Sequence, residues 1–291
     1  WIVCINCEIN YLIIIRLNKY LNLIKFEVTK DSMILGVIPA RLNSKRLPNK
    51  PLQLIDGMPI LTHVIKRALM SKRLDKLIVC TDDIKIAKLV KKNNLDVFLT
   101  SKNINSGTDR ISIFLKKNKQ KFRNLKLIVD IQCDEVFLNP KYLDRAINFH
   151  LKNIKKFDVV VPHTLTREEN NKNYVKIISN QKNEILYLTR ADAPLPFRSK
   201  KQPFKRHQDF ITFEPNFIAK FKNLKNRNLE NYEGIELLRV LENGYKMGTF
   251  KLETDSFSIN TKKDLLKSLL LIQKDKFRNF YKWSIWKKRY F

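Results

Sequence analysis

The stretch "MILGVIPARLNSKRLPNKPL", residues 33–52, joins an apolar run to a cationic loop. The run "MILGVIPA" is typical of a strand that is buried on both faces of a parallel sheet. The loop after it carries four cations, Arg41, Lys45, Arg46 and Lys50, within ten positions. Such a loop is either a solvated basic surface or a binding loop for a ligand with several negative charges.

Apolar runs and amphipathic stretches alternate after this stretch. We expect strands at residues 33–40, 75–83, 95–100, 125–135 and 157–164. We expect helices between them at residues 59–72, 84–94, 109–118 and 139–153. Alternation of this kind predicts right-handed βαβ units in an α/β fold, with a mostly parallel twisted sheet and helices on both faces.

The second half has a different pattern, which indicates a smaller antiparallel β subregion. Residues 174–190 are typical of two strands around a polar turn, and residues 207–218 of another strand. We expect a helix at 232–244, closing strands at 247–253 and 257–261, and a last helix at 262–275 with Thr261 as its N-cap. One domain should therefore span residues 33–275, with the antiparallel subregion at about 174–245.

The two ends of the chain differ from this domain. Residues 1–32 begin with Trp1 and contain an apolar stretch that is too short and too charged to be a comfortable membrane span. No small-residue cleavage site follows it, as a signal peptide would require. We expect an N-terminal extension that is dispensable or not native, so that a chain starting at Met33 would fold. Residues 276–291 form a basic aromatic tail.

The charge balance is strongly basic, with 57 Lys and Arg against 28 Asp and Glu and a formal net charge of +29. Such an excess raises the possibility of a nucleic-acid partner. However, the lysines are spread along the whole chain, which favours a compositional bias over a designed patch. We therefore expect no nucleic-acid partner and no stable membrane insertion.

The four cysteines do not suggest a disulfide framework. Cys4 and Cys7 form a single C-x-x-C pair, whereas a structural zinc site needs four ligands. Cys80 and Cys133 each follow an apolar run and are interpreted as small core residues. A reducing, cytoplasmic setting is expected. With only six glycines, the chain also lacks a Gly-rich phosphate loop.

Polar residues gather where three predicted strands end, at residues 41–50, 82–83 and 134–135. Ligands of open α/β sheets bind beyond the carboxyl ends of the strands, so these segments should meet at one edge. Arg and Lys suit a polyphosphate, and carboxylates suit Mg²⁺. Together they favour chemistry at the α-phosphorus of a nucleoside triphosphate.

The stretch "IPARLNSKRLPNKPL" (38–52) resembles the nucleotide-binding signature of the bacterial 3-deoxy-manno-octulosonate (Kdo) cytidylyltransferases. That signature runs Pro-Ala-Arg, then Ser-x-Arg-Leu-Pro-x-Lys-Pro-Leu. The matching positions are Pro39, Ala40, Arg41, Ser44, Arg46, Leu47, Pro48, Lys50, Pro51 and Leu52. Further segments resemble the family in order: "TDD" (81–83), "SGTDR" (106–110), "DIQCDE" (130–135), "YVKI" (174–177), "LYLTRADAP" (186–194), "FKRHQDFITF" (204–213) and "ENYEGIELLRVLENG" (230–244). The resemblance covers residues 33–272.

The resemblance implies an enzyme with a nucleotide-diphospho-sugar transferase-like fold. It would transfer CMP from CTP to the anomeric hydroxyl of Kdo or a close analogue, releasing pyrophosphate, for lipopolysaccharide biosynthesis. It implies Mg²⁺ as the cofactor and a homodimer formed through the second-half strands. The implied catalytic residues are Arg41, Lys50 and Asp134, and the implied metal ligands are Asp134 and Asn260. Nucleotide contacts would come from Pro39, Ala40, Arg41, Ser44, Arg46, Lys50, Thr81, Asp82, Ser106, Gly107, Thr108 and Arg110. Sugar contacts would come from Gln132, Arg190, His207, Glu233 and Glu236.

The chain departs from the family pattern on the sugar and metal side. Asn260 stands where the family has the second metal-binding Asp, so metal affinity should fall unless Asp255 or Asp264 compensates. Leu237 replaces a Gln, and Cys133 replaces a Gly beside Asp134. Asp209 and Ile211 also differ from the family's Gly-Ile-Tyr. The acceptor could therefore be 8-amino-Kdo or a sialic-type or pseudaminic-type acid, or the chain could be a weakly active homologue.

Overall fold

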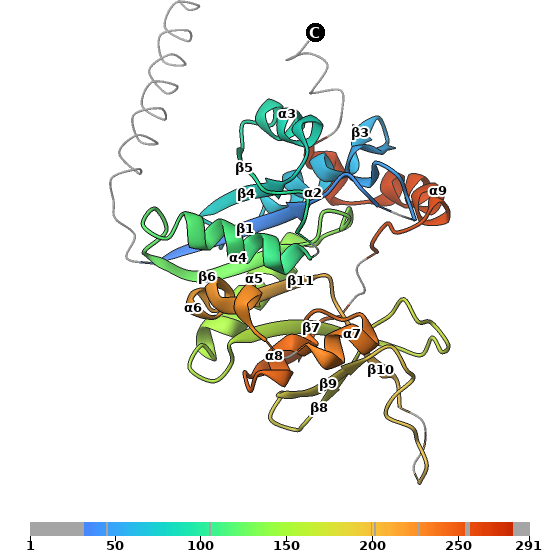
Figure 1. Cartoon of the computed structure of the whole chain (residues 1–291). Helices are drawn as coiled ribbons and strands as arrows, with labels where there is room; N and C mark the ends of the chain where they lie inside the picture. The colour runs from blue at the N-terminus through green and yellow to red at the C-terminus, as the bar shows by residue number, and fades with distance from the viewer. Residues whose placement is uncertain are drawn as a thin grey trace, which may run out of the picture.

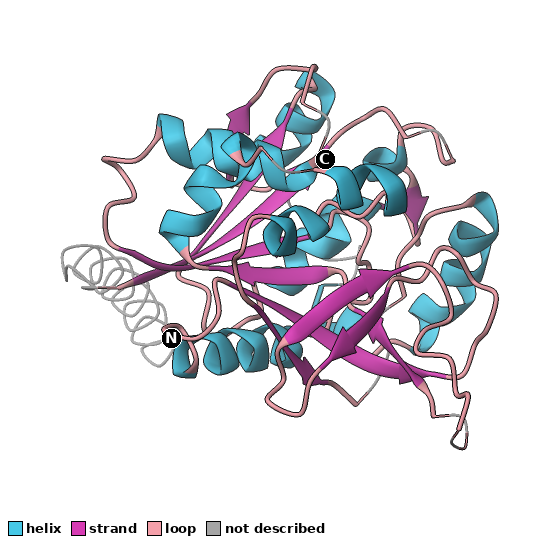
Figure 2. Cartoon of the chain, turned by 60° about the horizontal axis from the view of Figure 1, so that its bottom comes forward, coloured by secondary structure: helices cyan, strands magenta, loops and turns pink. Residues whose placement is uncertain are grey.

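The computed structural model describes residues 32–44, 46–104, 106–198, 200, 202–225, 227–253 and 257–281. A ten-stranded sheet runs through the molecule in the order β5-β4-β1-β6-β11-β7-β10-β8-β9, and β12 pairs with β7. Helices lie on both sides of these strands (Figures 1 and 2). The expectations for residues 1–31 and 282–291 lie outside the described residues.

Four strands form the parallel half of the sheet, which confirms the first four predicted strands. They are β5 (Asp96–Leu99), β4 (Lys76–Thr81), β1 (Met33–Ala40) and β6 (Leu125–Ile131). β1 lies between β4 and β6 and is parallel to both. The carboxyl ends of all four strands therefore meet at one edge, and the polar segments that follow them are brought together there.

Both faces of β1 are buried, which explains its continuous apolar run. Leu35 and Val37 join a core that also contains side chains of α4 (Gly107–Lys117) and α6 (Pro215–Lys220). Ile34 and Ile38 join the core on the opposite face. The helices on that face are α2 (Ile60–Ala68), α3 (Ile84–Lys92) and α5 (Pro140–Lys152).

The second half continues the same sheet with antiparallel strands, as expected. β7 (Val159–Thr166) is parallel to β12 (Met247–Lys251) and antiparallel to β10 (Phe204–His207) and β11 (Phe210–Phe213). β11 also pairs with β6, whereas β10 pairs with the hairpin of β8 (Lys176–Ser179) and β9 (Ile185–Thr189). The chain from 204 to 213 thus connects the parallel half to the antiparallel subregion.

Two predicted elements of the second half are interrupted in the structure. The strand expected at 207–218 ends at Phe213, because Pro215 starts α6 and the Glu214 side chain caps it by accepting from the Phe217 amide at 2.7 Å. The helix expected at 232–244 is split into α7 (Asn228–Glu233) and α8 (Leu238–Glu242). Gly234, with φ of 64°, terminates α7 in the left-handed region.

The closing segment also differs from the prediction. Residues 257–260 are not a strand, although the Ile259 amide donates to the Asp134 carbonyl at 3.2 Å. The predicted N-cap is confirmed: Thr261 and Asp264 form a capping box at the start of α9 (Lys262–Leu271). The shorter elements are β2 (Leu54–Ile55), β3 (Met58–Pro59) and the 3₁₀ turns η1 (Lys50–Leu52), η2 (Phe221–Asn223), η3 (Ile272–Lys274) and η4 (Phe277–Tyr281).

The turn η4 packs against α2 through a buried cation. Arg67 has no exposed surface, and its Nε donates to the Tyr281 hydroxyl at 2.8 Å while it also pairs with Asp275. The first residues of the aromatic tail therefore belong to the folded body. Among the helices that the structure describes, none has both the length and the apolar character needed to cross a bilayer.

Candidate active site

A cavity of about 1240 Å³ opens at the carboxyl edge of the parallel strands. Its walls come from the loop after β1, the start of α4, the residues after β6 and the segment around α7 and α8. Arg41, Lys50 and Asp134 all line this cavity. So do nine other residues predicted from the sequence: Pro39, Ala40, Ser44, Arg46, Ser106, Gly107, Arg110, Gln132 and Glu236.

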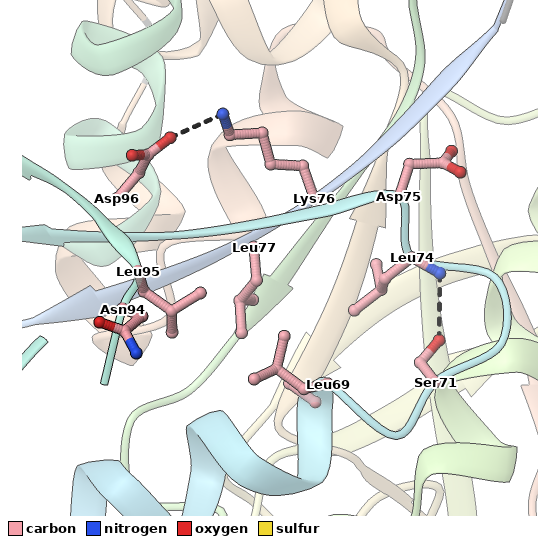
Figure 3. A pocket seen from close by; sticks show the side chains of 10 residues that line it. Leu69, Ser71, Leu74, Asp75, Lys76, Leu77, Asn94, Leu95 and Asp96 are labelled. Atoms are coloured by element: carbon pink, nitrogen blue, oxygen red, sulfur yellow. Dashed lines mark hydrogen bonds and ion pairs between the residues drawn. The ribbon is translucent and has the colours of Figure 1, made fainter. Parts of the chain in front are cut away.

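A smaller hollow of about 300 Å³ lies at the opposite, amino end of β4 (Figure 3). Leucine side chains, among them Leu69 and Leu77, line much of it. Its charged groups include Lys76 and Asp96, which form an ion pair at 2.6 Å. None of the predicted site residues lines this hollow, so it is not part of the candidate site.

The cations of the loop after β1 are held by polar groups from distant parts of the chain. Lys50 Nζ donates to Asp134 Oδ2 at 2.5 Å and to Asn260 Oδ1 at 3.2 Å. Arg46 donates through Nη2 to the same Asn260 oxygen and through Nη1 to Asn173 Oδ1, both at 3.0 Å. The loop is therefore ordered by contacts that also bring Asn260 beside Asp134.

Asp134 is a largely buried carboxylate, with 13% of its side chain exposed. Burial raises the pKa of Asp134, and the positive charge of Lys50 opposes that rise. Burial raises the pKa of the neighbouring Cys133 thiol to about 12. The Asp134 carboxylate supplies hard oxygen donors at this end of β6.

The donor set at Asp134 and Asn260 fits Mg²⁺. Both side-chain oxygens are in contact with one cationic group, Lys50 Nζ, so both face the same point. A carboxylate and a neutral amide oxygen are hard ligands of the kind that Mg²⁺ takes. In the part of the chain that the structure describes, no three His, Cys, Asp or Glu side chains form a metal-binding group. A magnesium ion here would therefore draw further ligands from water and phosphate, as is usual for this ion.

Asp264, considered above as a compensating ligand, is engaged elsewhere. Its Oδ2 accepts from the amides of Asn260 and Thr261 at 3.0 and 2.8 Å, in the capping box of α9. Asp255 lies outside the described residues.

The start of α4 packs closely against the end of β1. A Cβ at Gly107 would lie 3.2 Å from Pro39 Cγ, so glycine permits this approach. The Ser106 hydroxyl caps the helix by accepting from the Asp109 amide at 3.0 Å. Three residues of the first turn of α4, Gly107, Asp109 and Arg110, line the cavity wall.

Thr81, Asp82, Thr108 and Asn260 do not line the cavity. Thr81 and Thr108 are fully buried. Asp82 instead pairs with Arg110 Nη2 at 3.1 Å, and Arg110 also donates to Thr100. This contact fixes the orientation of Arg110, a cation that does line the cavity.

Buried carboxylate groups lie at the cavity wall and directly behind it. Gln132 Nε2 donates to both Asp130 oxygens, at 3.2 and 3.3 Å, which leaves the Gln132 carbonyl oxygen for other contacts. Asp130 is fully buried, and burial, with Glu236 and Asp209 nearby, raises its pKa well above the usual range. Glu236 Oε2 is buried with no hydrogen-bond partner among the described residues, and burial raises the pKa of Glu236.

Arg190, Glu233 and His207 lie outside the cavity lining. The Glu233 carboxylate accepts from the Thr189 hydroxyl and the Arg190 amide at 2.7 and 2.9 Å. Arg190 Nη2 donates to the carbonyl of Gly234, which does line the cavity, at 3.3 Å. Burial lowers the pKa of His207, while Asp209, 3.9 Å away, opposes this shift.

A family model described as "Cytidylyltransferase" matches residues 35–252. The chain belongs to this family. A 3-deoxy-manno-octulosonate cytidylyltransferase of Thermodesulfovibrio yellowstonii is 33% identical over 79% of this chain and 94% of the relative. An 8-amino-3,8-dideoxy-manno-octulosonate cytidylyltransferase of Shewanella pealeana is 30% identical, with 79% and 94% covered. A solved structure of CMP:2-keto-3-deoxy-manno-octonic acid synthetase complexed with CTP has a TM-score of 0.77 and 25% identity, and covers 83% of this chain and 99% of its own.

Sequence reasoning missed one charged cluster in the wall of this cytidylyltransferase. Arg239 Nη1 donates to Asp109 at 2.7 Å, and its Nε and Nη2 bond the two Glu230 oxygens, both at 2.6 Å. All three residues line the cavity. The available signal was an arginine within the apolar run "ELLRVL", since a buried guanidinium needs acidic partners.

Proposed function

We propose that the protein transfers CMP from CTP to the anomeric hydroxyl of Kdo or a close analogue and releases pyrophosphate. The observation that carries the proposal is the meeting of Arg41, Lys50 and Asp134 on one cavity at the carboxyl edge of the sheet. The names of the relatives supply the substrate class. Both Kdo and its 8-amino form are therefore candidate acceptors.

The loop after β1 would bind the triphosphate. Arg41 and Arg46 present guanidinium groups that match phosphate oxygens, and Lys50 adds a compact charge near Asp134. Ser44 and the backbone of Pro39 and Ala40 would complete the contacts on this side. Charge developing on the pyrophosphate would be neutralised by groups that are already in place.

The start of α4 would bind the nucleoside. Its first turn and the segment of Ser106, Gly107 and Thr108 would face the ribose and base side of the cavity, where the amides of a helix N-terminus can donate hydrogen bonds. Arg110, held by Asp82, would add a positive charge at the same wall, with Thr81 supporting that contact from the end of β4.

Asp134, with the oxygen of Asn260, would hold Mg²⁺. When bound, the ion supplies positive charge at the reacting phosphate and lowers the pKa of a hydroxyl that coordinates it. The chain's own contribution is to keep the two oxygens together and to order Lys50 beside them.

The acceptor would lie toward Gln132 and Glu236. The Gln132 carbonyl and the unpartnered Glu236 oxygen can bond sugar hydroxyls or an amine. Arg190, whose guanidinium reaches the Gly234 carbonyl, would attract the acceptor's carboxylate, with His207 and Glu233 completing this side. No covalent intermediate is needed, since positioning and charge neutralisation suffice.

An acceptor panel tests the proposed activity. Pyrophosphate release would be measured with CTP, Mg²⁺ and one of three acceptors: Kdo, 8-amino-Kdo or N-acetylneuraminic acid. Release with Kdo or its amino form is expected. If both stay silent while the sialic acid reacts, the proposed acceptor is wrong.

The role of Lys50 can be tested with a matched lysine. Lys50→Gln should lower kcat/KM for CTP by about 100-fold or more, because a charge next to the reacting phosphates is lost. Lys76→Gln breaks a similar ion pair with Asp96 at the other end of β4 and should leave kcat/KM unchanged. Equal effects of the two changes would contradict a specific role for Lys50.

Two further features belong to the proposal. A homodimer through the second-half segments is supported by the highly exposed Leu195 and Phe197 after β9. Light scattering of the purified chain would measure its mass, and a monomer at micromolar concentration would contradict the dimer.

A cytoplasmic location is supported by the free thiols of Cys80 and Cys133.

A further inference from the structure

The outer face of α9 is apolar and uncovered by the described residues. Leu266, Leu269 and Leu270 are 58%, 40% and 75% exposed, and their spacing of three and four places them on one side of the helix. Ser268 is the buried residue of α9, so the helix packs on the body through a narrow side. The strand β2 packs next to α9, and its Leu54 is also exposed.

Cations surround these leucines. Lys262, Lys263 and Lys267 on α9 and Lys274 on η3 are all exposed. The acids of this segment are already engaged, because Asp264 caps α9 and Asp275 pairs with Arg67. The surface of α9 thus combines apolar side chains with lysines that pair with no acid among the described residues.

This combination favours an anionic surface over a second copy of the chain. A two-fold contact through α9 would place the lysines of both copies against each other, and like charges repel. Anionic lipid headgroups attract lysines, and their acyl region accepts leucine side chains. We propose that α9 is a peripheral docking site for anionic lipid membranes.

The length and position of α9 suit a helix that lies along the surface of a membrane. α9 has ten residues and is about 15 Å long, so it would lie in the headgroup region and not cross the bilayer. It forms one edge of the molecule (Figure 1). It begins two residues after Asn260, so a membrane bound there would lie near the loop of Arg46 and Lys50.

Vesicle cosedimentation of the full chain tests this proposal. Vesicles of phosphatidylcholine alone would be compared with vesicles of equal parts phosphatidylcholine and phosphatidylglycerol. The chain should bind the anionic vesicles, and salt should weaken the binding. The triple variant Leu266→Gln, Leu269→Gln, Leu270→Gln keeps the net charge and should weaken binding on the order of tenfold or more. Failure of the unchanged protein to bind anionic vesicles would overturn the proposal.

Matched variants separate α9 from the general basic charge. Leu69→Gln with Leu99→Gln changes exposed leucines elsewhere and should leave binding unchanged. Lys262→Gln with Lys263→Gln should weaken binding more than Lys116→Gln with Lys117→Gln on α4, which removes the same charge from another surface. Equal loss from both lysine pairs would show binding by overall charge and would overturn the proposal. A lower molecular mass in solution for the triple leucine variant than for the unchanged protein would also overturn the proposal, because it would mean that α9 binds a second copy of the chain.

Turnover of CTP and the melting temperature of each variant would be measured in parallel. All the changed side chains are exposed, so both should match the unchanged protein.

Discussion

At the scale of single residues, the amide of Asn260 in place of a carboxylate changes the charge of the site. Its Oδ1 accepts from both Arg46 and Lys50, at 3.0 and 3.2 Å. An aspartate there would add a negative charge beside Asp134, whereas the amide is neutral. The present residue therefore keeps the loop in place, and under the proposed function it would offer Mg²⁺ a weaker ligand than an aspartate.

Asn260→Asp should tighten Mg²⁺ binding, measured by calorimetry with the nucleotide-free protein. The added carboxylate supplies a stronger hard ligand. Asn173→Asp is the control, because Asn173 also accepts from Arg46 but has no bond to Lys50. If Asn260→Asp and Asn173→Asp give the same Mg²⁺ affinity, Asn260 is not a ligand.

At the scale of elements, Arg239 connects the helices that form one cavity wall. It lies on α8, Asp109 on α4 and Glu230 on α7. Its guanidinium is 1% exposed and also lies over the Phe221 ring, 4.3 Å from the centroid. Because both ion pairs of Arg239 are largely buried, removing this cation leaves Asp109 and Glu230 without a partner in a poorly solvated place.

Arg239→Met should lower the free energy of unfolding by about 3 kcal/mol or more, measured by urea denaturation. Arg145→Met removes a solvent-exposed partner of Glu253 and should have little effect, because water screens that pair. A loss as small as that of Arg145→Met would mean that Arg239 does not hold the three helices together.

At the scale of the whole molecule, three buried histidines couple folding to pH. Burial lowers the pKa of His63, His150 and His163 to about 4 each. In the unfolded chain these groups titrate near 6.5, so between the two values the unfolded chain holds more protons. Lowering the pH from about 6.5 to about 4 should therefore destabilise the fold, by up to roughly 3 kcal/mol per histidine.

His150→Gln tests this coupling. His150 Nε2 lies 2.9 Å from the Phe157 carbonyl and Nδ1 lies 2.7 Å from the Thr212 hydroxyl. The loss of unfolding free energy between pH 7 and pH 5 should be about 2 kcal/mol smaller in this variant. Thr212→Val removes a bond but keeps the imidazole, so its pH dependence should resemble that of the unchanged protein. An unaltered slope in His150→Gln would refute the assignment.

The sequence alone determined the parallel half of the sheet and the loop after β1. A continuous apolar run such as residues 33–40 is typical of a strand with both faces covered, and the alternation of such runs with helices predicts that their carboxyl ends meet at one edge. The capping box at Thr261 is likewise a local signal, because all of its atoms lie within one helical turn.

The tertiary structure decided which polar residues serve the cavity and which serve the fold. Asp82 and Asp134 both follow buried strands, yet one pairs with Arg110 and the other meets Lys50 and Asn260. Arg239 finds Asp109 across 130 positions of chain. The hydrophobic periodicity of a segment indicates which of its faces is buried. The partner of a charged side chain depends instead on which distant segment the fold brings next to it. That is why the elements could be predicted and these pairings could not.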